Sequence, residues 1–146
     1  MKIVTDPVAL GKVCTELEFI PSQKIADKMI LWLRTDRRGK QVSEGAVGLA
    51  CNQLGFDARV FLLKRASGRW DTFINPVIVK RSDETYITDE GCLSIPNKEF
   101  KIKRSQKIVV VDGIGYDETK YTGRDAIVIQ HEIDHLNGIL ISDKEK

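Results

Sequence analysis

Apolar residues follow a helical period near both ends of the chain and a strand period between them. The first helical stretch is SQKIADKMILWLRTD, and Ser22 at its start suits the N-cap of a helix. Four apolar side chains fall on one face of this helix, which predicts core packing: Ile25, Met29, Trp32 and Leu33. The first twenty residues lack this period, so we expect an extended arm with a turn near Asp6-Pro7.

Short runs rich in β-branched and aromatic residues fill the middle of the chain and predict strands. They read ARVFLLK, TFINPVIVK, ETYITDEGCLSI, EFKIK and KIVVVDG. Turn-forming pairs at Ser67-Gly68, Asn75-Pro76 and Asp112-Gly113 punctuate these runs and favour antiparallel pairing. A polar, glycine-bounded loop is expected at 37–45, before the stretch GAVGLACNQLG.

The second helical stretch closes the chain. We expect it to begin near Thr122 and to run to Asn137, with Gly138 as its C-terminal stop. Strands followed by one closing helix predict an α+β fold, with antiparallel strands packed around that helix. The 146 residues contain no internal repeat and no low-complexity run, which predicts a single domain over 1–146.

The balance of charges excludes some classes of partner. The 23 basic and 21 acidic residues are interspersed and give a formal net charge of +2, so no broad basic field for nucleic acid is expected. One basic cluster, KEFKIKRSQK at 98–107, predicts a solvated strand face, with an acidic partner or the ribosome surface as the alternative. The start, MKIVTDPVALG, lacks a signal-peptide core, and no segment approaches about 18 apolar residues. We therefore expect neither secretion by that route nor a membrane span.

Three cysteines form an odd set without paired spacing: Cys14, Cys51 and Cys92. Such a set is typical of compartments in which thiols stay reduced or bind metal, so a cytosol-like compartment is expected. Cys14 and Cys51 are expected in the core, because free cysteines are among the most buried residues.

The closing helix carries the only two histidines of the chain, His131 and His135, within QHEIDHLNG at 130–138. Because they lie four residues apart, one helical turn brings both imidazoles to the same face, where they can bind one ion beside Glu132. A chance placement of two histidines and a glutamate in this order has a probability of roughly 0.1%. The pattern is typical of zinc peptidases, so a short zinc peptidase is one hypothesis.

A catalytic site of this kind needs three protein ligands and an open position for water. The extended peptidase pattern would place a third histidine where this chain has Ile141, and only Glu145 offers a carboxylate farther on. The third ligand should therefore come from upstream, from a cysteine or a carboxylate. Cys92 is the best placed cysteine, because Gly91 before it allows close backbone approach and a thiolate is a strong donor. An ordinary buried cysteine is the alternative for Cys92.

Three separated stretches of the chain resemble the peptide deformylase family. The family pattern contains G-x-G-L-A-A-x-Q, E-G-C-L-S and Q-H-E-x-D-H-L-x-G, in this order. The corresponding stretches here are AVGLACNQ at 46–53, EGCLS at 90–94 and QHEIDHLNG at 130–138. The chain departs from the pattern at Ala46 and Cys51, where the family has glycine and alanine, and both replacements are small.

The resemblance implies three groups of site residues. The metal ligands would be Cys92, His131 and His135. The catalytic group would be Glu132 as general acid/base, Gln53 and the backbone N–H of Leu93 as donors to the developing oxyanion, and Gly48. The apolar pocket for the methionine side chain would include Val47 and Ile127, for which core packing is the alternative.

The resemblance also implies an activity: removal of the formyl group from formyl-methionyl nascent peptides, which releases formate and a free amine. The cofactor would be one divalent ion, natively Fe²⁺, with Zn²⁺, Ni²⁺ or Co²⁺ able to replace it. Expected partners are nascent peptides and a transient ribosome contact, with no membrane and no specific nucleic acid. The expected compartment is the cytoplasm of a bacterium or of a phage-infected host, with an organellar stroma or matrix as the alternative. The chain ends eight residues after Gly138, which puts ribosome docking through a C-terminal helical extension in question.

Two acidic residues are expected to support the ligands. Asp134 follows His131 by three positions and is expected to orient the backbone or a neighbouring imidazole, and Glu90 is expected to pair with Arg104. An ordinary structural ion pair is the alternative for both. A third hypothesis for the whole chain is a non-enzymatic binding module that a metal stabilises.

Overall fold

The computed structural model describes residues 1–35 and 44–145. The loop predicted at 37–45 therefore lies mostly outside the described residues. Of the helices in the described part of the chain, none combines the length and the apolar run that a membrane span requires.

The N-terminal region differs from its prediction in two ways. The extended arm contains a short helix, α1 (Pro7–Leu10), which Asp6 caps by accepting a hydrogen bond from the Val8 N–H. Helix α2 (Phe19–Thr35) begins three residues before Ser22, so the predicted N-cap is wrong. The Ser22 N–H already donates to the Glu18 carbonyl at 3.1 Å. Pro21 is tolerated before it, because N–H groups of the first turn have no intrahelical partner.

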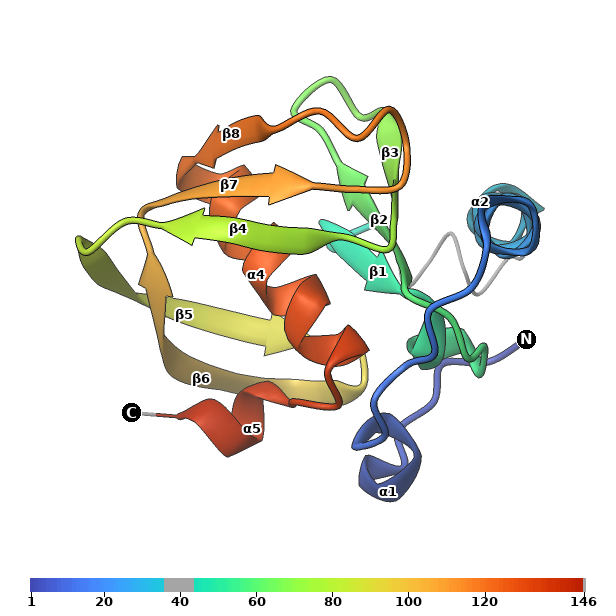
Figure 1. The fold of residues 1–146 in the computed structure, drawn as a ribbon. Coiled ribbons are helices and arrows are strands. Elements are labelled where there is room, and N and C mark those ends of the chain that lie inside the picture. Colours follow the sequence, from blue (N-terminus) through green and yellow to red (C-terminus); the bar gives the residue numbers. More distant parts are fainter. Residues whose placement is uncertain (36–43, 146) are drawn as a thin grey trace.

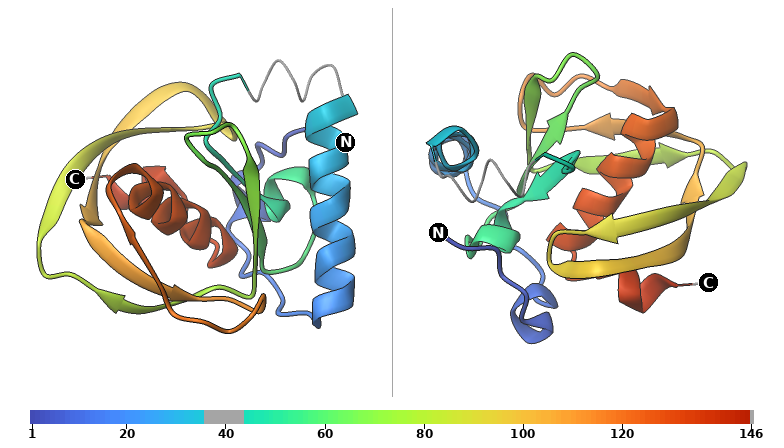
Figure 2. Two further views of the ribbon diagram at one scale, coloured as in Figure 1. Left: turned by 90° about the horizontal axis from the view of Figure 1, so that it is seen from above. Right: turned by 180° about the vertical axis from the view of Figure 1, so that it is seen from behind.

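The predicted apolar face of α2 is confirmed. Met29, Trp32 and Leu33 are buried, and Ile25 is half-buried against the same core. Figure 2 shows α2 on one side of the sheet formed by β1 (Gly48–Ala50), β2 (Val60–Lys64) and β3 (Trp70–Ile74), with α4 (Gly123–Leu136) on the other.

The strands pair antiparallel throughout, as predicted. They form three sheets, in the orders β1-β2-β3, β4-β7-β8 and β5-β6. Their bounds are β1 (Gly48–Ala50), β2 (Val60–Lys64), β3 (Trp70–Ile74), β4 (Val77–Arg81), β5 (Thr85–Cys92), β6 (Ile95–Ser105), β7 (Lys107–Val111) and β8 (Thr119–Thr122). A short 3₁₀ turn, η1 (Cys51–Leu54), follows β1.

Some strand boundaries were not evident from the sequence. The run TFINPVIVK is divided between two sheets at the predicted turn, where Asn75 has a φ of 47°. The prediction treated EFKIK as a strand of its own, whereas it lies inside β6, which forms a hairpin with β5. Strands β1 and β8 were not predicted, because segments of three or four residues are too short to show a period of two.

The closing helix is confirmed to within one residue. Helix α4 (Gly123–Leu136) has Thr122 and Asn137 at its two cap positions, and Gly138 follows with a φ of 71°. The strands surround α4, and the short helix α5 (Ile141–Lys144) lies beside the β5-β6 hairpin (Figures 1 and 2). This arrangement gives the predicted α+β fold, with one helix enclosed by antiparallel strands.

Candidate active site

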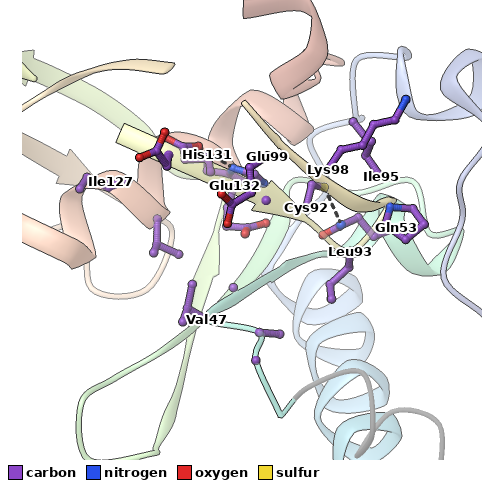
Figure 3. A pocket seen from close by; sticks show the side chains of 18 of the residues that line it. Val47, Gln53, Cys92, Leu93, Ile95, Lys98, Glu99, Ile127, His131 and Glu132 are labelled. Atoms are coloured by element: carbon purple, nitrogen blue, oxygen red, sulfur yellow. Dashed lines mark hydrogen bonds and ion pairs between the residues drawn. The ribbon is translucent and has the colours of Figure 1, made fainter. Parts of the chain in front are cut away.

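A cavity of about 820 Å³ opens where three parts of the fold meet. Its walls come from the segment that leads into β1, from the tip of the β5-β6 hairpin and from one face of α4. Figure 3 shows Cys92, His131 and Glu132 close together, with Val47 and Ile127 on one side of them and Gln53 and Leu93 on the other. The residues that the sequence singled out therefore meet in one place.

Cys92, His131 and His135 each offer a ligand atom, and these atoms lie within 4.8 Å of one another. Helix α4 presents the two imidazoles from successive turns, and Cys92 faces them from the end of β5, where a register shift follows Glu90. The Cys92 Sγ lies 3.3 Å from His135 Nε2. One sulfur and two imidazole nitrogens are ligands that divalent transition metals prefer, so the set fits such an ion.

Glu90 fixes the orientation of the His131 ring. Its Oε1 lies 2.9 Å from His131 Nδ1, which leaves Nε2 as the nitrogen on the ligand side. Burial raises the pKa of the Glu90 carboxyl, but hydrogen bonds from Arg104 and His131 outweigh it and bring the pKa to about 2. Burial likewise opposes charge on His131, yet the contacts with Cys92 and Glu90 raise its pKa to about 10. The Glu90 carboxyl is therefore ionised at neutral pH, where it can accept a hydrogen bond from His131 Nδ1.

The predicted pair between Glu90 and Arg104 is confirmed and has two contacts. The Arg104 Nε and Nη2 atoms each donate to Glu90 at 2.8 Å. The expectation that Asp134 orients the backbone or an imidazole is wrong, because its carboxylate makes neither contact in the described residues, and the ion-pair alternative holds. Its carboxylate instead accepts from Arg104 Nη1 at 2.6 Å and from Lys144 Nζ at 3.2 Å. Through these two contacts, Asp134 links α4 to the hairpin and to α5.

His135 has the opposite electrostatic environment. Burial and the nearby positive charge of His131 and Arg104 lower its pKa to about 3. The His135 imidazole is therefore neutral over the physiological range, whereas His131 would release its proton on binding a metal ion, because a metal ligand is a neutral imidazole.

Glu132 lies on α4 between the two histidines, and it is buried. Burial raises the pKa of its carboxyl to about 7. Its Oε2 has no hydrogen-bond partner among the described residues. A Cβ on Gly48 would overlap Glu132 Oε1 and would lie 2.8 Å from Val128 Cγ1, so a side chain there would displace one or both of these groups. The absence of a side chain at position 48 leaves room for the Glu132 carboxyl beside β1.

Gln53 lies in η1 with its amide at the edge of the ligand group. The Gln53 Oε1 accepts from the Ala50 N–H at 3.0 Å, which orients the amide. The Nε2 then donates to Ser94 Oγ at 3.1 Å and lies 3.6 Å from Cys92 Sγ. Leu93 follows Cys92 at the tip of the hairpin and is half-buried in the cavity wall.

Val47 and Ile127 both line the cavity, as expected for pocket residues. Val47 is 37% exposed, which disfavours the core-packing alternative for this residue. Ser94 and Val128 were not predicted, although Val128 precedes Glu132 by one helical turn and Ser94 lies within the EGCLS stretch. Helical spacing from Glu132 was the signal that could have identified Val128.

Comparisons with known proteins agree with this geometry. The polypeptide deformylase family model matches residues 1–146. The peptide deformylase of Pseudothermotoga lettingae is 32% identical over 146 residues, which cover 98% of this chain and 80% of that protein. The enzyme of Thermotoga neapolitana is 43% identical over 104 residues, and the match covers 68% of this chain and 62% of that protein.

Among solved structures, a probable peptide deformylase from Synechococcus phage S-SSM7 superposes with a TM-score of 0.82. It is 31% identical, and the match covers 99% of both chains. The peptide deformylases are metal-dependent hydrolases, which agrees with a cysteine and two histidines within reach of one ion. The chain belongs to the polypeptide deformylase family.

Proposed function

We propose that this chain, acting as one catalytic domain, removes the formyl group from the formyl-methionyl end of new polypeptides and releases formate. The observation that carries the proposal is the meeting of Cys92, His131 and His135 beside the buried carboxyl of Glu132. The alternative of a small zinc peptidase is not favoured, because the family match is to deformylases. The alternative of a non-enzymatic module leaves the raised pKa of Glu132 without a use.

Cys92, His131 and His135 would hold the metal ion. We assign Fe²⁺ as the native ion, with Zn²⁺, Ni²⁺ or Co²⁺ as replacements, since imidazole and thiolate suit all of these. An ion held there would act as a Lewis acid, which would polarise the formyl oxygen and lower the pKa of a bound water to about 7. Glu90 holds the His131 ring through Nδ1, which leaves Nε2 available to bind the ion.

Glu132 moves the proton in this proposal. Its carboxyl has a pKa of about 7 and projects from α4 without a competing hydrogen bond at Oε2 in the described residues. It can therefore accept a proton from the attacking water and deliver it to the departing amine nitrogen. The position of Gly48 keeps this carboxyl close to β1.

Two donors are proposed for the charge that develops on the formyl oxygen. The Gln53 amide is fixed through its Oε1 by the Ala50 N–H, so its Nε2 is preorganised. The backbone N–H of Leu93, next to Cys92 in the chain, is the second donor. Each oxyanion donor of this kind is worth about 3 to 4 kcal/mol in other hydrolases.

The substrate would lie along the cavity, with its methionine side chain between Val47 and Ile127. Strand β1 is an outer strand of its sheet, and β2 is its one strand partner in the described chain, so its other edge can align a peptide backbone. Formyl-methionyl nascent peptides are thus the proposed partner. The proposed compartment is the cytoplasm of a bacterium or of a phage-infected host. A transient ribosome contact belongs to the same proposal.

The test uses protein purified without oxygen and loaded with iron or nickel. Formate release from formyl-Met-Ala-Ser is measured for the wild type and for Glu132→Ala, together with the metal content of each. Loss of a general base predicts a fall of about 10² to 10⁴ with the metal content unchanged. Equal rates for the two proteins would contradict the role of Glu132. Cleavage of internal peptide bonds in place of formate release would favour the peptidase.

A further inference from the structure

The 3₁₀ turn η1 contacts both parts of the candidate metal centre, the histidines on α4 and Cys92 on the β5-β6 hairpin. Two consecutive residues of the turn make these contacts. The Asn52 Nδ2 donates to the main-chain carbonyl of His135 at 2.9 Å. The next side chain, Gln53, contacts the Cys92 Sγ and Ser94 from the same turn. One short turn therefore touches a ligand on α4 and a ligand on the β5-β6 hairpin.

The turn itself is held by several contacts, so it can act as a fixed support. The Val4 N–H donates to the Gln53 carbonyl at 2.8 Å, and the Phe56 N–H donates to the Cys51 carbonyl at 3.1 Å. The Cys51 thiol donates to the Ala58 carbonyl at 2.9 Å. The side chains of Cys51 and Asn52 are both buried, with 0% and 8% of their surface exposed. A donor on such a turn has little freedom to follow the group that it binds.

We propose that Asn52 is a positioning residue of the metal centre, which sets the place of His135 relative to Cys92. This inference rests on the proposed metal site and names a residue that the ligand pattern does not contain. The two ligand atoms lie 3.3 Å apart and come from elements distant in the sequence. Metal–sulfur and metal–nitrogen bonds of about 2.3 and 2.1 Å tolerate only small errors in that spacing.

Arg59 allows this role of Asn52 to be distinguished from simple stabilisation of the end of α4. The Arg59 Nη1 donates to the Leu136 carbonyl at 2.9 Å, and its Nη2 donates to Asn137 Oδ1 at 2.8 Å. Arg59 thus supports the same last turn of α4 from just before β2, but these two hydrogen bonds go to residues that are not ligands. The carbonyls at the end of a helix lack intrahelical donors, so both residues stabilise the helix end.

The test compares Asn52→Leu, which removes one side-chain hydrogen bond to the end of α4, with Arg59→Met, which removes two. Zinc affinity is measured by competition with a chromophoric chelator, and cobalt-loaded protein gives the thiolate and ligand-field absorption bands. Urea unfolding of chelator-treated protein gives the stability of each variant. We expect both variants to lose stability, but only Asn52→Leu to weaken zinc affinity by about tenfold and to shift the cobalt bands.

Equal changes of zinc affinity in the two variants, or no change in Asn52→Leu, would overturn the proposal. If Asn52→Leu does not fold, Asn52→Ala removes the same donor with less steric demand and is measured in the same way. Measurements on the wild-type protein distinguish failure of this inference from failure of the proposed function. Wild-type protein that binds cobalt through sulfur but releases no formate would overturn the activity alone, whereas failure to bind either metal would overturn both.

Discussion

The contact between Gly48 and Glu132 shows how one missing side chain can shape the site. A Cβ at position 48 would overlap the Glu132 carboxylate, whereas at Gly45 nothing lies within 4 Å of an added Cβ. We expect Gly48→Ala to displace the Glu132 carboxylate and to lower formate release by at least about tenfold, since small displacements of a catalytic group cost this much or more. The measurement is the rate of formate release at equal metal content.

Gly45→Ala is the matched control for this prediction, because it makes the same change in the same segment without a clash. It should retain the wild-type rate within about twofold. A Gly48→Ala variant as active as Gly45→Ala would show that Glu132 does not need its present position.

The low pKa of the Glu90 carboxyl predicts that the folded chain loses stability in acid. Its pKa is about 2 in the folded chain against an ordinary value of 4.5, so its contribution is complete above about pH 4.5 and is lost as the pH falls toward 2. We expect the free energy of unfolding of the wild type to fall between about pH 5 and about pH 2.5, and Glu90→Gln to lose less over that range. Urea unfolding of chelator-treated protein avoids a contribution from metal release. An identical pH dependence in the two proteins would remove Glu90 as the source.

Cys51, one of the two departures from the family pattern, has surroundings that disfavour reaction of its thiol. Its side chain is fully buried, and a hydrogen bond with Cys14, together with burial, raises the pKa of its thiol. A thiol in this state reacts slowly, because the thiolate is the nucleophile. Both Cys14 and Cys51 lie in the core, as the sequence predicted.

At the scale of single residues, the sequence was informative where local spacing determines geometry. His131 and His135 had to share a face of one helix, and the resemblance supplied Cys92, which the fold brings within reach. Asn52 could not be found in this way, because its role depends on the contact between η1 and the end of α4, 83 residues away. Long-range contacts of this kind leave no periodic signal.

At the scale of elements, long periodic segments were predictable and short ones were not. Helix α4 was placed to within one residue because its apolar period and its terminal glycine agree. Strand β1, which carries Gly48, has only three residues and exists through its pairing with β2. Tertiary contacts, not local preference, determine such a strand.

The end of α4 gives a prediction about stability. Gly138 has a φ of 71°, and an added Cβ would lie 2.5 Å from the Gly11 carbonyl oxygen. We expect Gly138→Ala to lower the free energy of unfolding by about 2 to 4 kcal/mol, of which about 1 kcal/mol is left-handed strain and the rest is overlap. Urea unfolding measures this difference.

Gly55→Ala is the control, because Gly55 has a φ of 86° but nothing lies within 4 Å of its added Cβ. It should lose only about 1 kcal/mol. Equal losses of unfolding free energy in the two variants would mean that Gly11 moves away from the added Cβ at position 138 without a measurable loss of stability.

For the whole molecule, Arg104 connects the parts that build the site. Its guanidinium binds Glu90 on β5 and Asp134 on α4, and Lys144 on α5 binds the same Asp134 carboxylate. The sequence suggested the Arg104–Glu90 pair but not the link to α5, because that link needs the hairpin folded against α4. The side chains of Arg104, Glu90 and Asp134 are at most 11% exposed, so water screens their charges poorly.

This network predicts a large effect of Arg104→Met on the stability of the whole chain. The substitution keeps most of the apolar stem but leaves the Glu90 and Asp134 carboxylates buried with less compensating charge. Removing one partner of a buried ion pair costs about 3 to 5 kcal/mol, and we expect a loss of that order in urea unfolding. Arg81→Met is the control, because Arg81 also joins a strand to α4 but binds the neutral Gln130 Oε1 at 3.2 Å. Adding Asp134→Asn to Arg104→Met should recover part of the loss, since it removes one of the uncompensated charges. A loss in Arg104→Met no larger than in Arg81→Met would show that this network does not hold the hairpin to the helix.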